Sequence, residues 1–217
     1  MKQVLVLLTL LFIATASSSA ELVFSTTTSQ VNLDALEKQC QKQVTELAES
    51  AGVEIKIMQL PFRRAVRWAN SGRIDGLVAR TDSIEKTFPN LIKLGDECAR
   101  TTLHLVTLKP NEFVFIDWAN VPDNYALGNL SGAEIVLEKI EAKNKNLKLI
   151  EAGTGQQLVD MFLTGRFEMM LAPPKLIPVL ESRSNNQLSV VKRNVIDIIL
   201  YPYIHKKHKN LLVKLPH

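Results

Sequence analysis

The chain has 217 residues, with 26 basic and 22 acidic side chains and a formal net charge of +4 at neutral pH. This length suits one domain or two small ones. The mild, dispersed positive charge lacks the clustered basic face that nucleic-acid binding requires, so we expect no partner of that class.

Residues 1–20 have the pattern of a cleavable secretory signal peptide. Lys2 supplies a positive start, the apolar run VLVLLTLLFIA (4–14) follows, and small residues precede an expected cleavage site before Glu21. The apolar run is short for a membrane crossing, although an uncleaved anchor is the alternative. No later segment is long and apolar enough to span a membrane, so we expect an exported protein.

Two cysteines, Cys40 and Cys98, are present. In an exported chain the oxidising compartment allows them to form a disulfide. Two buried thiols are the alternative, because the sequence does not show whether the two Cα atoms approach to about 4.4–6.8 Å, as a disulfide requires.

The first part of the chain alternates strands with helices, judged by hydrophobic periodicity and by glycine and proline breaks. The expected order is a strand at 21–29, a helix at 31–51, a strand at 53–60, a helix from Pro61 to Gly72 and a strand at 74–79. Strands joined in this way by helices form parallel sheets.

The pattern restarts after extended segments at 91–109 and a loop at 111–124. We expect strands at 125–130, 147–152 and 167–172, helices at 132–144, 156–165 and 176–183, an extended segment at 188–204 and a final helix from His205.

The segments NSGRIDGLVAR (70–80) and LTGRFEMMLAP (163–173) match without a gap after a shift of 93 positions, which pairs Asp75 with Glu168. The match predicts two similarly built α/β lobes, although any two strand–helix–strand units share some of this pattern. Ligands of such sheets bind at the carboxyl ends of the strands, where helix N-termini favour an anion.

Four segments in order resemble the bacterial periplasmic solute-binding proteins that include the polar-amino-acid receptors of ABC transporters. They are the signal peptide, LPFRRAVRWANSGRIDGLVAR, FPNLIKL and YPYIHKKHKNLL. The resemblance implies a two-lobed α/β fold of type II, with two parallel or mixed sheets flanked by helices and a two-segment hinge. It places one lobe at 21–104 plus 190–217 and the other at 105–189.

The resemblance also implies ligand-binding residues. Arg80 would hold a ligand carboxylate through its guanidinium fork; an ion pair with Asp82 or Glu85 is the alternative. Ser131 and Gly132 would add a hydroxyl and backbone N–H groups, although Ala133 replaces a frequent Ser or Thr. Phe62, Thr26 and Thr154 would line the cleft, with core packing, turn and helix-cap roles as their alternatives.

Two departures from the family pattern bear on the ligand and on the chain end. Relatives keep an aspartate after the last strand of the second lobe to hold the ligand's α-ammonium, and here the position is Pro173. A standard α-amino acid is therefore not the expected ligand. Relatives also continue with a longer final helix after a segment like HKKHKNLL.

The implied function is capture of a small, carboxylate-bearing solute in the periplasm by a monomer that passes it to the membrane permease of an ABC transporter. No cofactor, metal or catalysis is expected, and His205 and His208 are too few ligands for a zinc site. The alternatives are a sensing subunit for a signalling protein and a dehydratase-like enzyme. The enzyme would need an acid or base in the cleft, and Asp75 and Glu168 are expected to be structural.

Overall fold

The computed structural model describes residues 21–27, 34–82, 84–130, 140 and 144–212. The predicted signal peptide, most of the predicted helix at 132–144, and the predicted site residues Ser131 and Gly132 lie outside these residues. Within them, no helix combines the length and the apolar character that a membrane crossing needs.

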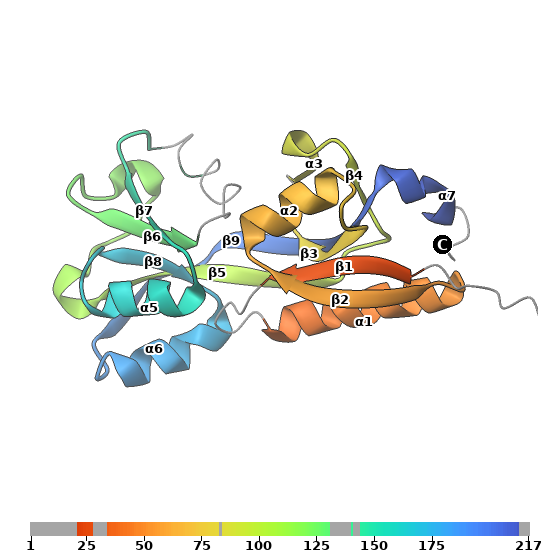
Figure 1. Cartoon of the computed structure of the whole chain (residues 1–217). Helices are drawn as coiled ribbons and strands as arrows, with labels where there is room; N and C mark the ends of the chain where they lie inside the picture. The colour runs from red at the N-terminus through yellow and green to blue at the C-terminus, as the bar shows by residue number, and fades with distance from the viewer. Residues whose placement is uncertain (1–20, 28–33, 83, 131–139, 141–143, 213–217) are drawn as a thin grey trace, which may run out of the picture.

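The described chain forms two α/β lobes side by side, as expected (Figure 1). The strands are β1 (Glu21–Thr27), β2 (Glu54–Leu60), β3 (Gly76–Arg80), β4 (Leu91–Lys93), β5 (Ala99–Leu108), β6 (Ala126–Leu130), β7 (Lys148–Ala152), β8 (Met169–Ala172) and β9 (Leu188–His205). The α-helices are α1 (Asp34–Ser50), α2 (Phe62–Asn70), α3 (Ile84–Thr87), α5 (Gly155–Leu163), α6 (Ile177–Arg183) and α7 (Lys209–Leu212).

Each lobe is built on three parallel strands. β1 pairs with β2 and β3 in the first lobe, and β6 pairs with β7 and β8 in the second. The antiparallel strands β5 and β9 connect the lobes (Figure 1). β9 has 18 residues; its last part pairs with β3 and β4, and the rest pairs with β5. The hydrogen-bonded strand order is therefore continuous, β2-β1-β3-β9-β5-β8-β6-β7.

The repeated sequence forms the same helix end twice. The N–H groups of Ser71, Gly72 and Arg73 donate to carbonyls of α2, and the residues 93 positions later make the same bonds at the end of α5. Gly72 and Gly165 have φ of 74° and 69°, in the left-handed region that glycine adopts without strain. The repeat predicted from the sequence therefore corresponds to repeated local structure.

The acidic residues at equivalent positions of the repeat have a structural role. Asp75 Oδ2 accepts from the N–H of Val23 on β1 at 2.9 Å, and Glu168 Oε2 accepts from the N–H of Ala126 on β6 at 2.8 Å. Each carboxylate thus fixes the loop before a strand to the neighbouring central strand. Asp75 also binds the chain after β9, because Oδ1 lies 2.8 Å from Lys207 Nζ and 2.6 Å from His208 Nε2.

The contacts of Asp75 control its charge. Burial alone would raise its pKa, but the hydrogen bonds from Lys207, Val23 and His208 outweigh burial and hold the pKa below the usual value for aspartate. Asp75 is therefore ionised at neutral pH. The final helix begins later than the expected start at His205. A 3₁₀ turn that carries Lys207 and His208 comes first, and α7 begins at Lys209.

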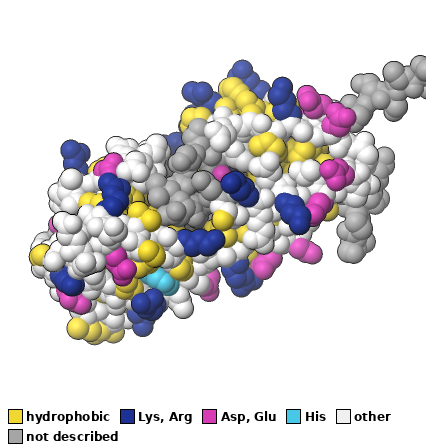
Figure 2. Space-filling model, turned by 90° about the horizontal axis from the view of Figure 1, so that it is seen from below, with side chains coloured by type: hydrophobic (Ala, Val, Ile, Leu, Met, Phe, Trp, Pro, Cys, Tyr) yellow, Lys and Arg dark blue, Asp and Glu magenta, His cyan; other side chains and the backbone are white. Residues whose placement is uncertain are grey.

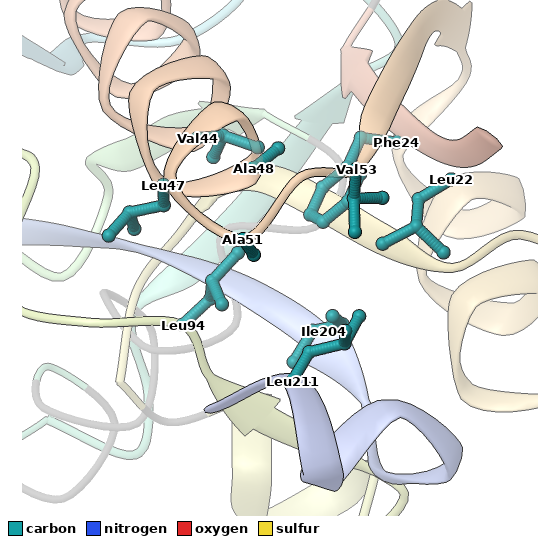
Figure 3. Close-up of a pocket in the computed structure, with 10 residues that line it drawn as sticks. All are labelled: Leu22, Phe24, Val44, Leu47, Ala48, Ala51, Val53, Leu94, Ile204 and Leu211. Carbon is teal, nitrogen blue, oxygen red and sulfur yellow. The ribbon is translucent and has the colours of Figure 1, made fainter. Parts of the chain in front are cut away.

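The core of the first lobe packs both faces of its sheet. α1 covers one face and α2 the other, as Figure 1 shows. A cavity of about 20 Å³ lies between α1, the sheet and Leu211 of α7 (Figure 3), room for about one water. All of its lining side chains are apolar, so it does not suit an anionic solute.

Gly76, the first residue of β3, has no space for a side chain. A Cβ atom there would lie 2.3 Å from the ring of Phe24 and 2.4 Å from the carbonyl oxygen of Tyr203. We expect Gly76→Ala to lower the free energy of unfolding by about 3 kcal/mol, since the backbone of β9 must move. Urea denaturation measures the change, with Gly153→Ala as the control because its Cβ meets only the Gln157 side chain, at 3.3 Å. Equal stability of the two variants would contradict this prediction.

Candidate functional site

The carboxyl ends of the parallel strands of the two lobes face the middle of the molecule. Figure 1 shows β1 and β6 ending toward each other, and the strands parallel to each share its direction. Residues that end these strands and begin the next segments are therefore the candidates for contact with a ligand between the lobes.

Arg80 is the last residue of β3, one position earlier than the expected place after the strand, and its side chain is buried. Its exposed fraction is 5%, and Nη1 donates to the carbonyl of Ala79. Among the described residues, no acceptor lies within hydrogen-bonding reach of Nε or Nη2. Neither Asp82 nor Glu85 forms a salt bridge with it, so the alternative of a surface ion pair is wrong.

The charge of Arg80 persists despite its burial. Desolvation lowers the pKa of the guanidinium to about 10, and the negative charge of Glu37 acts in the opposite direction. The group is therefore a cation at neutral pH. A buried cation with unsatisfied donors is costly, and an anionic group that accepts from those donors removes much of that cost.

Phe62 lies next to Arg80. The Arg80 Cζ atom is 4.9 Å from the centroid of the Phe62 ring, close enough for a cation–π contact. The ring is half-buried and also packs against the apolar cluster around α2. Phe62 thus shares its surface between the lobe core and Arg80, and the two residues predicted for the site are in contact.

An ion pair joins the lobes beside Phe62. Arg63 Nη2, at the start of α2, lies 3.4 Å from Glu151 Oε2 on β7, and the two side chains are 58% and 50% exposed. The pair thus joins the two lobes through residues 88 positions apart in the sequence.

We expect reversal of the Arg63 charge to favour a more open arrangement of the lobes, because a carboxylate at position 63 would repel Glu151. Exposed pairs contribute about 0–1 kcal/mol, so Arg63→Glu should shift a closed–open equilibrium by up to about fivefold. Small-angle X-ray scattering of the ligand-free protein at low salt should give a larger radius of gyration for Arg63→Glu.

Two control variants test whether the larger radius of gyration comes from loss of the Arg63–Glu151 pair. The swap Arg63→Glu with Glu151→Arg should restore the wild-type radius, and Arg67→Glu, on the same helix but outside the pair, should not change it. An identical radius for Arg63→Glu and the wild type would show that the pair does not hold the lobes together.

The predicted threonines differ in their surroundings. Thr26, near the end of β1, is buried, and its carbonyl accepts from the Ser25 hydroxyl at 2.8 Å. Thr154 is the exposed N-cap of α5, where its hydroxyl oxygen accepts from the N–H of Gln157 at 3.1 Å. That is the helix-cap role given as its alternative.

The strand ends of the second lobe contain one residue that sequence reasoning missed. Asn129 on β6 is 5% exposed, and its Oδ1 has no hydrogen-bond partner among the described residues. Pro173 and Pro174 follow β8, and neither offers a side-chain acceptor or a backbone N–H.

Metal-binding and charge patterns add no other site. In the described part of the chain, no group of three or more His, Cys, Asp or Glu side chains is arranged to hold a metal ion. On the face drawn in Figure 2, Lys and Arg side chains are interspersed with acidic and apolar ones. The region around Arg80 and Phe62 therefore remains the candidate site.

The fold is the two-lobed fold of periplasmic binding proteins, of type II, as the sequence resemblance implied. The arginine-bound form of ArgBP from T. maritima is similar, with 13% identity, a TM-score of 0.68 and coverage of 90% of this chain and 92% of that one. A putative L-cystine ABC transporter protein from Listeria monocytogenes has 16% identity, a TM-score of 0.68 and coverages of 90% and 86%.

A third similar structure belongs to a different kind of protein. The periplasmic VFT2 domain of BvgS from Bordetella pertussis has 13% identity, a TM-score of 0.65 and coverages of 90% and 84%. No family model and no curated protein matches the sequence. At these identities the similarity establishes the fold, and the function rests on the site.

Proposed function

We propose that this chain is a periplasmic solute-binding protein that captures a small, carboxylate-bearing solute between its lobes and delivers it to the permease of an ABC transporter. The observation that carries this proposal is Arg80, a buried cation with unpaired Nε and Nη2 donors at the carboxyl end of β3. Two neighbouring donors of a guanidinium match the two oxygens of a carboxylate.

The arrangement of the lobes supports capture between them. We place the lobes at 21–104 plus 190–217 and at 105–189, with β5 and β9 as the hinge. The β5–β9 register shifts on either side of Leu105. There the N–H of Asn194, whose φ is 52°, donates to His104 Nδ1 at 3.0 Å. Such an irregularity in paired strands is a natural place for bending.

The solved relatives support binding over catalysis, since they include an arginine-bound protein and an ABC transporter protein. Sensing for a signalling protein is the second candidate function, supported by the similarity to the periplasmic VFT2 domain of BvgS. Both functions need solute capture. They differ in the membrane partner, which cross-linking in intact cells would distinguish.

A thermal-shift screen with a library of small carboxylates tests solute capture. A ligand of the native state raises the unfolding temperature in proportion to RT ln(1 + [L]/Kd). We expect at least one carboxylate to raise the unfolding temperature in a concentration-dependent way. Equal shifts with uncharged analogues of the same acids, or no shift across the library, would reject the proposal.

A further inference from the structure

The described residues contain three buried side-chain atoms that lack a hydrogen-bond partner. Two are the Nε and Nη2 donors of Arg80, and the third is the Oδ1 acceptor of Asn129. Buried polar groups are nearly always satisfied in folded proteins, so each exception calls for an explanation. Arg80 is explained by the proposed function, on which the following inference rests, and Asn129 is not.

The amide orientation of Asn129 leaves its oxygen without a partner. Nδ2 donates to the carbonyl of Leu130 at 3.3 Å. A flipped amide would place Oδ1 against that carbonyl, acceptor against acceptor. The oxygen therefore points away from the Leu130 carbonyl, and its exposed area is below 1 Å².

A series of contacts connects Asn129 of the second lobe to Arg80 of the first. Asn129 is the register partner of Glu151 on β7. Glu151 contacts Arg63 of the first lobe, and the adjacent Phe62 lies against Arg80. This series of contacts therefore runs from the carboxyl end of β6 in the second lobe to the carboxyl end of β3 in the first lobe.

Matching hydrogen bonds in the two lobes place Asn129 at the position equivalent to Thr26, a predicted ligand contact of the first lobe. Asp75 accepts from Val23 on β1, and Glu168 accepts from Ala126 on β6, so these two strand positions are equivalent. Thr26 and Asn129 each lie three residues further along their strands and are therefore equivalent too. Both residues are buried polar side chains near the carboxyl end of a central strand. The second lobe therefore presents an acceptor where the first presents a hydroxyl.

We infer that Asn129 Oδ1 accepts a hydrogen bond from an uncharged O–H or N–H group of the solute whose carboxylate binds Arg80. An ammonium group is disfavoured, because a buried ammonium requires a carboxylate partner. The strand ends of the second lobe, as far as the structure describes them, contain one carboxylate, Glu151, which is half-exposed and contacts Arg63. The solute class is thus hydroxy or amido carboxylates.

Native mass spectrometry of the full chain after equilibration with a metabolite extract tests this inference. The probe is the small molecule retained by the wild type, whose mass gives its composition. We expect the retained molecule to be a carboxylic acid with an uncharged O–H or N–H donor. The control Asn146→Leu, which alters an exposed asparagine of the same lobe, should retain it as well as the wild type does. Asn129→Leu should bind it at least tenfold more weakly while unfolding at no lower urea concentration.

A second variant distinguishes the charge of the donor. Asn129→Asp should weaken binding, because it adds a buried negative charge beside an anionic solute; stronger binding would reveal an ammonium group and overturn the inference. A donor-free acid or an α-amino acid as the retained molecule would also overturn it, whether or not the variants fold. Equal retention by Asn129→Leu, with loss in Arg80→Met, would reject the role of Asn129 alone. No retained molecule on the wild type would reject the proposed function itself.

Discussion

Replacing Arg80 by methionine should abolish solute binding without lowering the stability of the ligand-free protein. Methionine is close in length to the arginine stem and is apolar, so it fills the buried site. Each hydrogen bond to a charged group contributes about 1.5–3 kcal/mol, and two bonds are lost. We therefore expect at least about a hundredfold weaker affinity.

An ordinary core substitution lowers the free energy of unfolding, but Arg80→Met should not do so in the ligand-free protein. The wild type buries a cation whose Nε and Nη2 have no acceptor among the described residues. Removing that charge relieves a desolvation cost, so the free energy of unfolding should stay equal or increase. Calorimetric titration with a solute found by the carboxylate screen measures affinity, and urea denaturation measures stability.

Arg67→Met is the matched control for this substitution. Arg67 is an exposed arginine on α2, outside the strand ends, so its loss should change neither quantity appreciably. If Arg80→Met bound the solute as tightly as the wild type, the guanidinium would not be the anchor. If Arg80→Met unfolded much more easily, Arg80 would have a structural role that its contacts do not show.

Loss of the Cys40–Cys98 disulfide should be the largest single change in stability. In the structure the two sulfurs are bonded, with Cα atoms 4.8 Å apart, and the bond links α1 to the residue before β5. The cysteines are separated by 58 residues in sequence. A cross-link of that span restricts the unfolded chain, which corresponds to about 4 kcal/mol of unfolding free energy.

The measurement is urea denaturation of the wild type and of Cys40→Ala with Cys98→Ala, each with and without a reductant. Alanine avoids a buried hydroxyl, since both cysteines are in the core. The reductant should destabilise the wild type and leave the double variant unchanged. Similar stability of the oxidised wild type and the double variant would contradict the prediction.

The sequence predicted local structure well, because its determinants lie close together in the chain. Gly72 and Gly165 each follow an apolar helical stripe, and both end a helix with the same hydrogen bonds. The shared acids of the repeat, Asp75 and Glu168, were expected to be structural, and both accept from a central strand. These features need only a few neighbouring residues.

Contacts between the lobes were harder to predict. The Arg63–Glu151 pair and the unpaired oxygen of Asn129 depend on how two separate units face each other. Asn129 has no sequence pattern of its own, and its equivalence to Thr26 emerges only from the hydrogen bonds of Asp75 and Glu168 in the structure. The contact of Phe62 with Arg80 was approached through family resemblance, because spacing alone cannot distinguish a cleft aromatic from a core one.

A crystal structure of the protein with the solute retained from a metabolite extract tests the central claim most directly. The account predicts an anionic group of the solute between the lobes, with its oxygens about 2.7–2.9 Å from Nε and Nη2 of Arg80. It also predicts that Phe62 lies beside the solute. A solute bound outside this cleft, or one held there with its anionic group away from Arg80, would contradict the account.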